Sequence, residues 1–555
     1  MFESRASLLL HYCGHCFMVG DTGFMKWRPA NFVLFFTIHL CGCLILSAQE
    51  RFKIKGRVVD SESGVVLPAR LYIESDTGEF FHVLSASDSG KAVPYSKVRG
   101  NGSVEVHSTL SAHPFVADLP VGKYTLTAER GKEYFTIKKE IVVSDNQGPE
   151  EVVLSLERWI DMASRGWYSG ETHVHRTVEE LPTLMLAEDL NVAFPLTAWV
   201  TDSQATPLLN SKNPDLVPPA ELIEIDSTHV IWPVNTEYEI FTVNGNRHTL
   251  GAVFILNHKE ALEMAAPPVS PIAEEARRQG AILELDKHNW PWSMMLVPVM
   301  KVELFELTNN HIWRTQFQFK TWYPEYVGDY MNIEMEDGGF TERGWIDFGF
   351  KNYYALLNCG FDMKPTAGTA SGVHPVPLGF GRVYVKVDGE FSYEKWLGGL
   401  VAGRSFVTTG PMLEVEYKRR GDTVNISGTF DISTDYDGLP VELIVNGKRR
   451  AYLSRKGHAM NTIRNLSFEF DHELEGTSWI AVRAFDNTDE GRPRFAHTAP
   501  VFFDVPGKPL QSRPEEVAYL VRRVENEISR HTGVLKEVAL DEYREALRYY
   551  QSLLD

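Results

Sequence analysis

The chain has 555 residues, of which 43% are hydrophobic and 23% are charged, and its formal net charge is −19. About three or four domains are expected, because a chain of this length exceeds what one hydrophobic core usually supports. The composition is that of folded protein and excludes wholesale disorder. The acidic balance and the lack of a long basic patch exclude nucleic acid as the expected partner, since phosphate binding needs a basic face.

The first 48 residues are expected to direct export rather than to fold. From Met25 a short basic stretch precedes an apolar run (residues 32–46), and Ala48-Gln49 follows closely. This order is typical of a secretory signal peptide cleaved after Ala48, with residues 1–24 as an extension upstream of the true start. The protein is therefore expected in the periplasm or outside the cell. No membrane span is expected after cleavage, because the run is shorter than the roughly 20 residues that a spanning helix needs.

A lipoprotein anchor is the alternative, because residues 40–43 loosely resemble a lipoprotein cleavage box. The apolar residues 44–46 that follow are unusual at the start of a mature lipoprotein, which favours the signal peptide. Four of the five cysteines lie within this expected leader, so only Cys359 remains, as a buried packing thiol. Stability is therefore expected to come from hydrophobic cores or from metal rather than from disulfides.

Residues 51–155 are expected to form a β-sandwich. Short apolar or alternating runs, such as Leu71-Tyr72-Ile73, are separated by turn clusters, and residues 119–126 show a turn followed by period-two alternation. The segment resembles the carboxypeptidase regulatory-like domains that precede catalytic domains in exported enzymes. That resemblance implies a fold and no chemistry.

Three further segments follow along the chain. In residues 160–410 apolar strands alternate with helical stretches, which predicts an α/β domain of about the size of a barrel. Residues 411–506 return to strand patterns with a hairpin turn at residues 445–448, and they predict a second sandwich. Residues 512–555 predict a helical tail, because apolar residues recur there at helical spacing. This tail is expected to dock on the body of the protein.

The strongest chemical signal is the pair His173 and His175, within residues 166–176. Residues two apart project to the same side of a strand, so both imidazoles can face one cation. Imidazole is a ligand suited to zinc, iron, manganese or nickel. A His-x-His pair alone is common by chance. Its position at the first strand of an α/β domain nevertheless favours a metal site, because barrel chemistry gathers at the C-terminal ends of strands.

Residues 165–411 resemble the CehA/McbA-type metallohydrolases, a branch of the PHP (polymerase and histidinol phosphatase) superfamily. The resemblance rests on the opening His-x-His and on five further segments, namely residues 187–191, 285–288, 308–311, 354–361 and 402–408. It implies a distorted (β/α)7 barrel, here flanked by the two sandwiches and the helical tail. It also implies an exported enzyme with a divalent metal centre that hydrolyses an ester, amide, carbamate or phosphoester bond.

Five residues match the ligands that this resemblance implies or are the best candidates for them: His173, His175, Glu237, His288 and His311. The first two are the opening His-x-His. Glu237 stands where the superfamily places a bridging acid, and Glu239 on the same face of its segment could replace it. His288 and His311 each follow a predicted strand. For His311, a hydrogen-bonded core histidine is the structural alternative.

One part of the family pattern is missing. Many of these enzymes end their site with Gly-Ser-Asp-x-His, whose aspartate and histidine bind metal, whereas this chain has Gly368-Thr369-Ala370-Ser371-Gly372. Both ligands are absent, and His374 lies nearby in a shifted register. The resemblance therefore leaves either a site with one metal or no catalysis.

The expected catalytic roles follow from residue type. A zinc, manganese or iron ion held here would lower the pKa of water to about 7 and polarise the scissile bond. Asp286 or Glu188 is expected to act as general base, and Lys287 or Arg176 is expected to stabilise developing negative charge. Two structural alternatives stay open: Glu188 can lie on a helix surface, and Lys287 can form an ion pair with Asp286.

Two functions are compatible with the sequence. The first is a metal-dependent hydrolase of a small-molecule or glycan-like substrate. Five aromatic residues could line its pocket or serve only in packing: Trp290, Trp292, Trp313, Trp322 and Tyr323. The second is a non-catalytic barrel with a degenerate site that binds a ligand such as polysaccharide at the cell surface. Metal content distinguishes the two, and the oligomeric state has no signal in the sequence.

Overall fold

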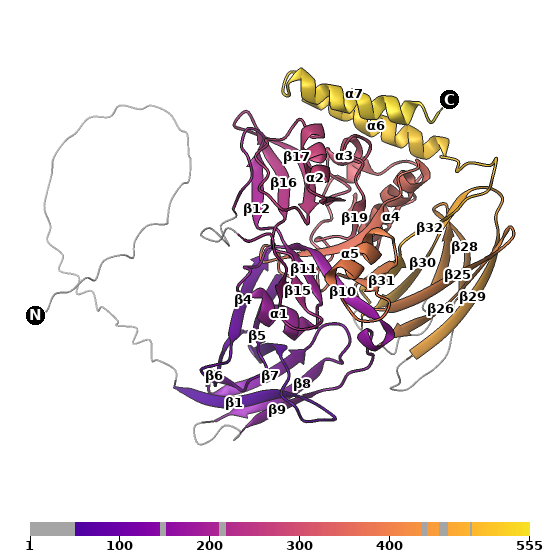
Figure 1. Cartoon of the computed structure of the whole chain (residues 1–555). Helices are drawn as coiled ribbons and strands as arrows, with labels where there is room; N and C mark the ends of the chain where they lie inside the picture. Colours follow the sequence, from indigo (N-terminus) through magenta and orange to yellow (C-terminus); the bar gives the residue numbers. More distant parts are fainter. Residues whose placement is uncertain are drawn as a thin grey trace, which may run out of the picture. The chain divides into compact units, whose positions relative to one another are not determined.

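Figure 1 shows the computed structural model of the chain, in which the described residues are 50–100, 102–144, 151–209, 218–433, 441–453, 464–488 and 491–554. The expected leader and the cysteines within it lie outside these ranges. Cys359 is buried and forms no disulfide. Across the described part of the chain, no helix is long and apolar enough to cross a membrane.

The N-terminal region consists of two sheets that share one core. The first sheet runs in the order β3 (Val83–Ser85), β6 (Phe115–Pro120), β1 (Arg51–Asp60) and β9 (Val152–Leu156). The second runs β4 (Ala92–Arg99), β5 (Ser103–Leu110), β2 (Ala69–Ser75), β7 (Gly122–Glu129) and β8 (Ile137–Val143). Alternate residues of β7, such as Tyr124 and Leu126, are buried, because successive side chains of a strand point to opposite faces. Each sheet thus contributes one apolar face to the core.

The strand pairings of the central region close on themselves. The parallel pairs start with β10 (Trp167–Val174) and continue through β11 (Val192–Pro195) to β15 (Val230–Ile231). After a short break, the chain continues from β11 into β12 (Ala198–Asp202) and from β15 into β16 (Thr236–Val243). These two strands again pair in parallel. Antiparallel pairs lead from β16 to β17 (Asn246–Leu256) and β18 (Ile282–Leu285). Parallel pairs then join β18, β19 (Leu304–Thr308) and β22 (Lys364–Ser371), and β22 returns to β10. The sheet is therefore mixed, because β17 runs against both of its neighbours.

Short elements and helices connect these strands. The short strands are β13 (Leu208–Leu209), β14 (Ile223–Glu224), β20 (Met335–Glu336) and β21 (Gly339–Phe340), and the 3-10 turns are η1 (Ala163–Arg165) and η2 (Pro324–Tyr326). The helices are α1 (Leu181–Glu188), α2 (Ser270–Arg278), α3 (Ser293–Met300), α4 (Glu342–Asn358) and α5 (Tyr393–Val401). α4 begins after Thr341, whose side-chain oxygen accepts the Gly344 N–H at 2.9 Å and so satisfies a free donor of the first turn. The inner face of α4, including Trp345 and Tyr353, enters the largest core of the protein.

The C-terminal β region continues the central sheet. From β10 the antiparallel order is β23 (Arg382–Lys386), β24 (Ser405–Thr408), β31 (Pro493–Thr498), β30 (Ser478–Asn487), β27 (Val441–Val445) and β28 (Lys448–Leu453), and β32 (Val501–Phe503) also pairs with β30. A separate antiparallel sheet comprises β25 (Met412–Arg420), β26 (Thr423–Ile432) and β29 (Arg464–Glu473). Side chains of both sheets, such as Phe406 and Ile426, form one core. β24 ends before residue 410 and is hydrogen-bonded to β31, which lies well after it. The sheet therefore continues across the domain boundary that the sequence patterns predict at residue 410.

The two terminal helices lie against the central region (Figure 1). They are α6 (Pro514–His531) and α7 (Glu537–Gln551). The Tyr519 hydroxyl of α6 donates to Asn352 of α4 at 2.7 Å, and the Tyr550 hydroxyl of α7 donates to the Met294 carbonyl of α3 at 2.8 Å. Val517, Leu520 and Val524 of α6 and Tyr543 of α7 are buried as well, so both helices form part of the body.

Buried ion pairs join the N-terminal region to the end of α1. The Arg70 guanidinium of β2 contacts both Glu188 and Glu129, and the side chains of Arg70 and Glu188 are each only 4% exposed. Beside them, the Arg130 and Arg158 guanidiniums lie 2.9 and 2.6 Å from the carboxylate of Asp189. Since charge buried this deeply is tolerated only when it is paired, these contacts fix the N-terminal region against the central one.

Arg70→Ala is expected to lower the free energy of unfolding by about 3–5 kcal/mol, because it leaves the buried carboxylate of Glu188 without its partner and removes one of the two arginines near Glu129. Chemical denaturation monitored by tryptophan fluorescence measures the loss. Arg57→Ala is the matched control, since Arg57 pairs with Glu151 at 3.4 Å while 43% exposed, and it should cost no more than about 1 kcal/mol. Equal losses in the two variants would contradict the role given to Arg70.

Candidate metal centre

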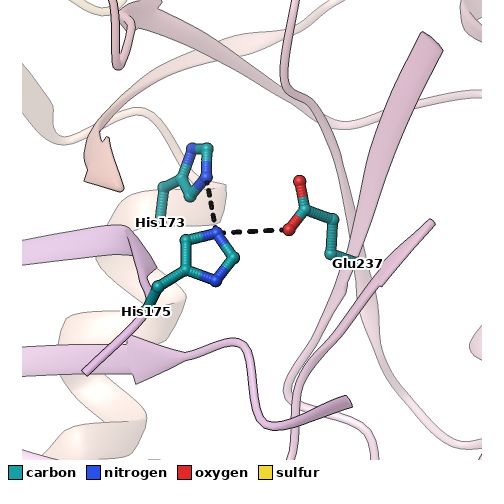
Figure 2. A group of neighbouring side chains, drawn as sticks. All are labelled: His173, His175 and Glu237. Atoms are coloured by element: carbon teal, nitrogen blue, oxygen red, sulfur yellow. Dashed lines mark hydrogen bonds and ion pairs between the residues drawn. The ribbon is translucent and has the colours of Figure 1, made fainter. Parts of the chain in front are cut away.

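His173 of β10 and His175, the first residue after that strand, converge with an acid of β16 (Figure 2). His173 and His175 are two residues apart, their Nε2 atoms face each other, and both residues are buried. Gly368 of β22 makes room for these side chains, because a Cβ at this position would collide with His173 Cβ and Glu306 Oε1. Glu237 approaches from β16 and is also buried. The fold therefore brings together three potential ligands from the end of β10 and from β16, which lie far apart in sequence.

The distances within this trio are those expected of ligands around one cation. His173 Nε2 lies 3.2 Å from His175 Nε2, and His175 Nε2 lies 3.3 Å from Glu237 Oε2. Ligand atoms placed tetrahedrally at about 2.0–2.1 Å from zinc are about 3.3–3.4 Å apart. Glu237 Oε2 has no hydrogen-bond donor among the described residues. The trio thus offers two imidazole nitrogens and a carboxylate oxygen, a donor set that suits zinc, iron or manganese.

A second group of acids surrounds the other nitrogen of His173. His173 Nδ1 lies 3.3 Å from each carboxylate oxygen of Glu306 and 3.6 Å from Asp286 Oδ1. A proton on Nδ1 that is donated to Glu306 leaves Nε2 free to bind a cation, and such a carboxylate partner also makes the imidazole a stronger ligand. Glu306 is fully buried in β19. It therefore orients the ring that Figure 2 shows facing His175.

Lys287 supplies positive charge beside the acids. Its Nζ contacts Asp286 directly and lies 3.2 Å from Glu239 Oε1 and 3.9 Å from Glu237 Oε1. Burial alone would lower the pKa of Lys287, but these three carboxylates outweigh burial and hold its pKa above the ordinary value. Lys287 is therefore a protonated ammonium group within the site.

The acids outnumber this single ammonium group. Burial raises the pKa of Glu237 to about 8, with a further increase from Asp286, and burial likewise raises the pKa of Glu239 to about 8. The pKa of Glu306 is raised well above its ordinary value by burial and by Asp286. Burial, His175 and Lys287 lower the pKa of His173, so its ring is neutral, as a ligand must be. A divalent cation would supply the charge that these groups lack.

The structure brings together His173, His175, Glu237, Asp286 and Lys287 from the residues expected on sequence grounds. It does not bring His288 or His311 into the group. The His288 ring lies among the rings of Phe305, Trp345 and Phe348, and neither of its nitrogens has a hydrogen-bond partner among the described residues. Burial lowers the pKa of His288 to about 3.

His311 lies in an aromatic environment as well, against Phe319 and Trp345. Each of these two histidines follows a strand of the ring, but neither belongs to a group of potential ligands among the described residues. Following a strand is therefore not a sufficient criterion for a ligand.

Two of the expected catalytic residues have other partners. Glu188 belongs to the ion pair with Arg70 described above and to none of the groups of potential ligands, so its role as general base stays a prediction. Arg176 lies 3.2 Å from Glu180 and its guanidinium stacks 4.6 Å from the centre of the Tyr95 ring. Arg176 is thus held at the edge of the site, next to the N-terminal region.

Glu306 is the important residue that the sequence interpretation missed. It stands alone as an acid within the apolar strand β19. A single carboxylate in the middle of a buried strand was the available signal, because such a charge persists only where a partner or a metal compensates it. Asp286, expected as a base, is also close enough to His173 and Glu306 to serve as a ligand.

The sequence matches no known family model and no curated protein. One solved structure similar to this chain is a two-domain protein from Bacteroides vulgatus, described as containing a predicted PHP-like metal-dependent phosphoesterase. It shares 10% sequence identity, the alignment covers 61% of this chain and 96% of that one, and the TM-score is 0.28. At that TM-score the similarity decides neither the fold nor the activity of this chain. The functional proposal therefore rests on the geometry of the side chains.

The purified protein is expected to bind about one equivalent of a divalent metal, and removal by a chelator should lower its melting temperature. His175→Ala should abolish both the bound metal and the chelator effect, because it removes His175 Nε2, the atom that lies close to both His173 and Glu237. Elemental analysis and thermal denaturation measure the two outcomes. His113→Ala, a histidine of the N-terminal region held only by serines, is the matched control and should retain the metal. Full metal content in His175→Ala would refute this site.

Glu306→Gln is expected to weaken metal affinity by about 10–100-fold while the fold stays intact. The amide can still accept from His173 Nδ1, but it cannot raise the basicity of the ring as a carboxylate does. Competition with a chromogenic chelator measures the affinity. An unchanged affinity would show that Glu306 does not act through His173.

Proposed function

We propose that this chain is an exported metal-dependent hydrolase of the PHP superfamily, of the CehA/McbA type. The proposal includes a metal ion bound by His173, His175 and Glu237, and a substrate with an ester, carbamate, amide or phosphoester bond. The convergence of these three side chains at ligand-to-ligand distances of 3.2 and 3.3 Å is the observation that carries it. The closed ring of strand pairings supports the distorted barrel that the family implies, and the leader-like sequence before Gln49 supports export.

The proposed chemistry needs a cation and two kinds of protein group. A divalent cation at this position lowers the pKa of water and polarises the oxygen of the scissile bond. Asp286 Oδ1 has no hydrogen-bond donor among the described residues, and it can therefore accept a proton within the site. The ammonium group of Lys287 can stabilise negative charge that develops on a substrate oxygen, since it is buried where such interactions are strong.

Loss of the usual aspartate and histidine after Gly368 is compatible with one bound metal. The chain has Ala370 and Gly372 at these two positions, and neither has a side chain that can bind a metal. The trio and the second acidic group remain complete without them. We therefore propose a site that works with fewer metal ions than its relatives use.

The test is hydrolysis of a chromogenic panel by the metal-loaded protein, with p-nitrophenyl acetate, p-nitrophenyl phosphate, a naphthyl carbamate and a p-nitroanilide. At least one compound is expected to turn over, with loss on chelation and recovery on return of the metal. Asp286→Asn should lower kcat by about 100-fold or more, as expected for loss of a general base. His113→Ala should keep full activity. Turnover that survives chelation would refute the proposal, and no turnover with any metal would favour a non-catalytic binding protein.

A further inference from the structure

The N-terminal region reaches the edge of the candidate metal centre through β4. Residues 95, 97 and 99 alternate along this strand, so Tyr95, Lys97 and Arg99 project to one face. The Tyr95 hydroxyl donates to the His374 carbonyl and accepts from the Gly372 N–H at 2.9 Å. These two partners follow β22, at the place where the usual aspartate and histidine ligands are missing. β4 is thus anchored where the site departs from the family pattern.

Arg99 extends furthest along this face toward the site. Its Nη1 donates to Nδ1 of His374 and lies 3.5 Å from Nε2 of the same ring. The residue as a whole is exposed, and no carboxylate of the described residues lies within ion-pair distance of it. Glu239 of the acidic group is close enough to raise its pKa, although burial lowers the pKa overall. Arg99 is therefore a cation that faces the centre, touches solvent and forms no direct ion pair.

A continuous chain of contacts links Arg99 to the metal-binding trio. His374 Nε2 lies 3.4 Å from the Asn310 side-chain amide, and the Asn310 backbone N–H donates to Glu306 Oε1 at 3.1 Å. Glu306 in turn lies 3.3 Å from His173 Nδ1. The Arg99 guanidinium is thus connected to the metal-binding trio through His374, Asn310 and Glu306.

We propose that Arg99, with Lys97 beside it, recognises an oxyanion on the substrate, so that the N-terminal region selects phosphate- or carboxylate-bearing substrates for the metal centre. This inference rests on the proposed function. A guanidinium matches the oxygens of either group in bidentate geometry, and such charge-assisted hydrogen bonds are stronger than neutral ones. An arginine next to an acidic site and without an ion-pair partner is placed to favour anions that the acids would otherwise repel.

The decisive experiment compares Arg99→Gln with the wild-type protein on anionic and neutral substrates that share the p-nitrophenyl leaving group. The anionic substrates are p-nitrophenyl phosphate and mono-p-nitrophenyl succinate, and the neutral one is p-nitrophenyl acetate. Arg99→Gln is expected to raise KM for the anionic substrates about tenfold, with little effect on the neutral ester. Arg99→Lys should recover part of the loss, because it restores charge without the planar fork. The phosphate and succinate results show which oxyanion the site prefers.

Binding of inorganic phosphate to the metal-loaded protein gives a readout that does not need turnover. Calorimetric titration is expected to show about tenfold weaker binding in Arg99→Gln, whereas Lys55→Gln, an exposed change on the opposite sheet, should bind as the wild type does. Equal losses on anionic and neutral substrates would overturn the proposal and show that Arg99 only positions His374. Unchanged binding of both inorganic phosphate and succinate, titrated in the same way, would overturn it as well. Absence of turnover in the wild type would instead count against the proposed hydrolase, and the titration would still decide the role of Arg99.

Discussion

A surplus of buried carboxylates around two imidazoles is the constraint on which the centre of this protein depends. Glu237, Glu239, Asp286 and Glu306 share their space with one ammonium group, that of Lys287. Full ionisation of all four would leave negative charge without a partner, and a low-dielectric interior penalises such charge heavily. The pKa values of Glu237 and Glu239 are raised because burial disfavours their charged forms, and added positive charge would therefore stabilise the site. The surrounding ring of strands holds these groups together despite their repulsion.

The sequence allowed part of this centre to be predicted, because some of its geometry is local. Period-two spacing on a strand sufficed to place His173 and His175 on one side, and the family pattern indicated Glu237. Glu306 has no nearby motif, and only the pairing of β19 with β22 brings it to His173. Side chains that follow a strand, such as those of His288 and His311, depend on how the next loop turns. Neither that turn nor a pairing between distant segments can be derived from local spacing.

The same distinction applies to the fold. Strand and helix patterns, which arise from neighbouring residues, predicted β-rich segments on both sides of an α/β one and a helical tail. Contacts between residues far apart in sequence could not be predicted from local patterns, as the pair of Arg70 and Glu188, 118 positions apart, illustrates. Those contacts make the N-terminal region a fixed neighbour of the central one. This is why a strand such as β4 can place Tyr95 and Arg99 at a site formed by other segments.

The hydrogen bonds that cross residue 410 have a practical consequence for anyone who divides this chain into pieces. β24 pairs with β23 on one side and with β31 on the other. A fragment that stopped after β24 would expose one row of backbone donors and acceptors, and a fragment that began with β25 would expose the matching row on β31. Unpaired edges of this kind promote aggregation, so poor solubility of either fragment would reflect a severed sheet rather than an unstable fold.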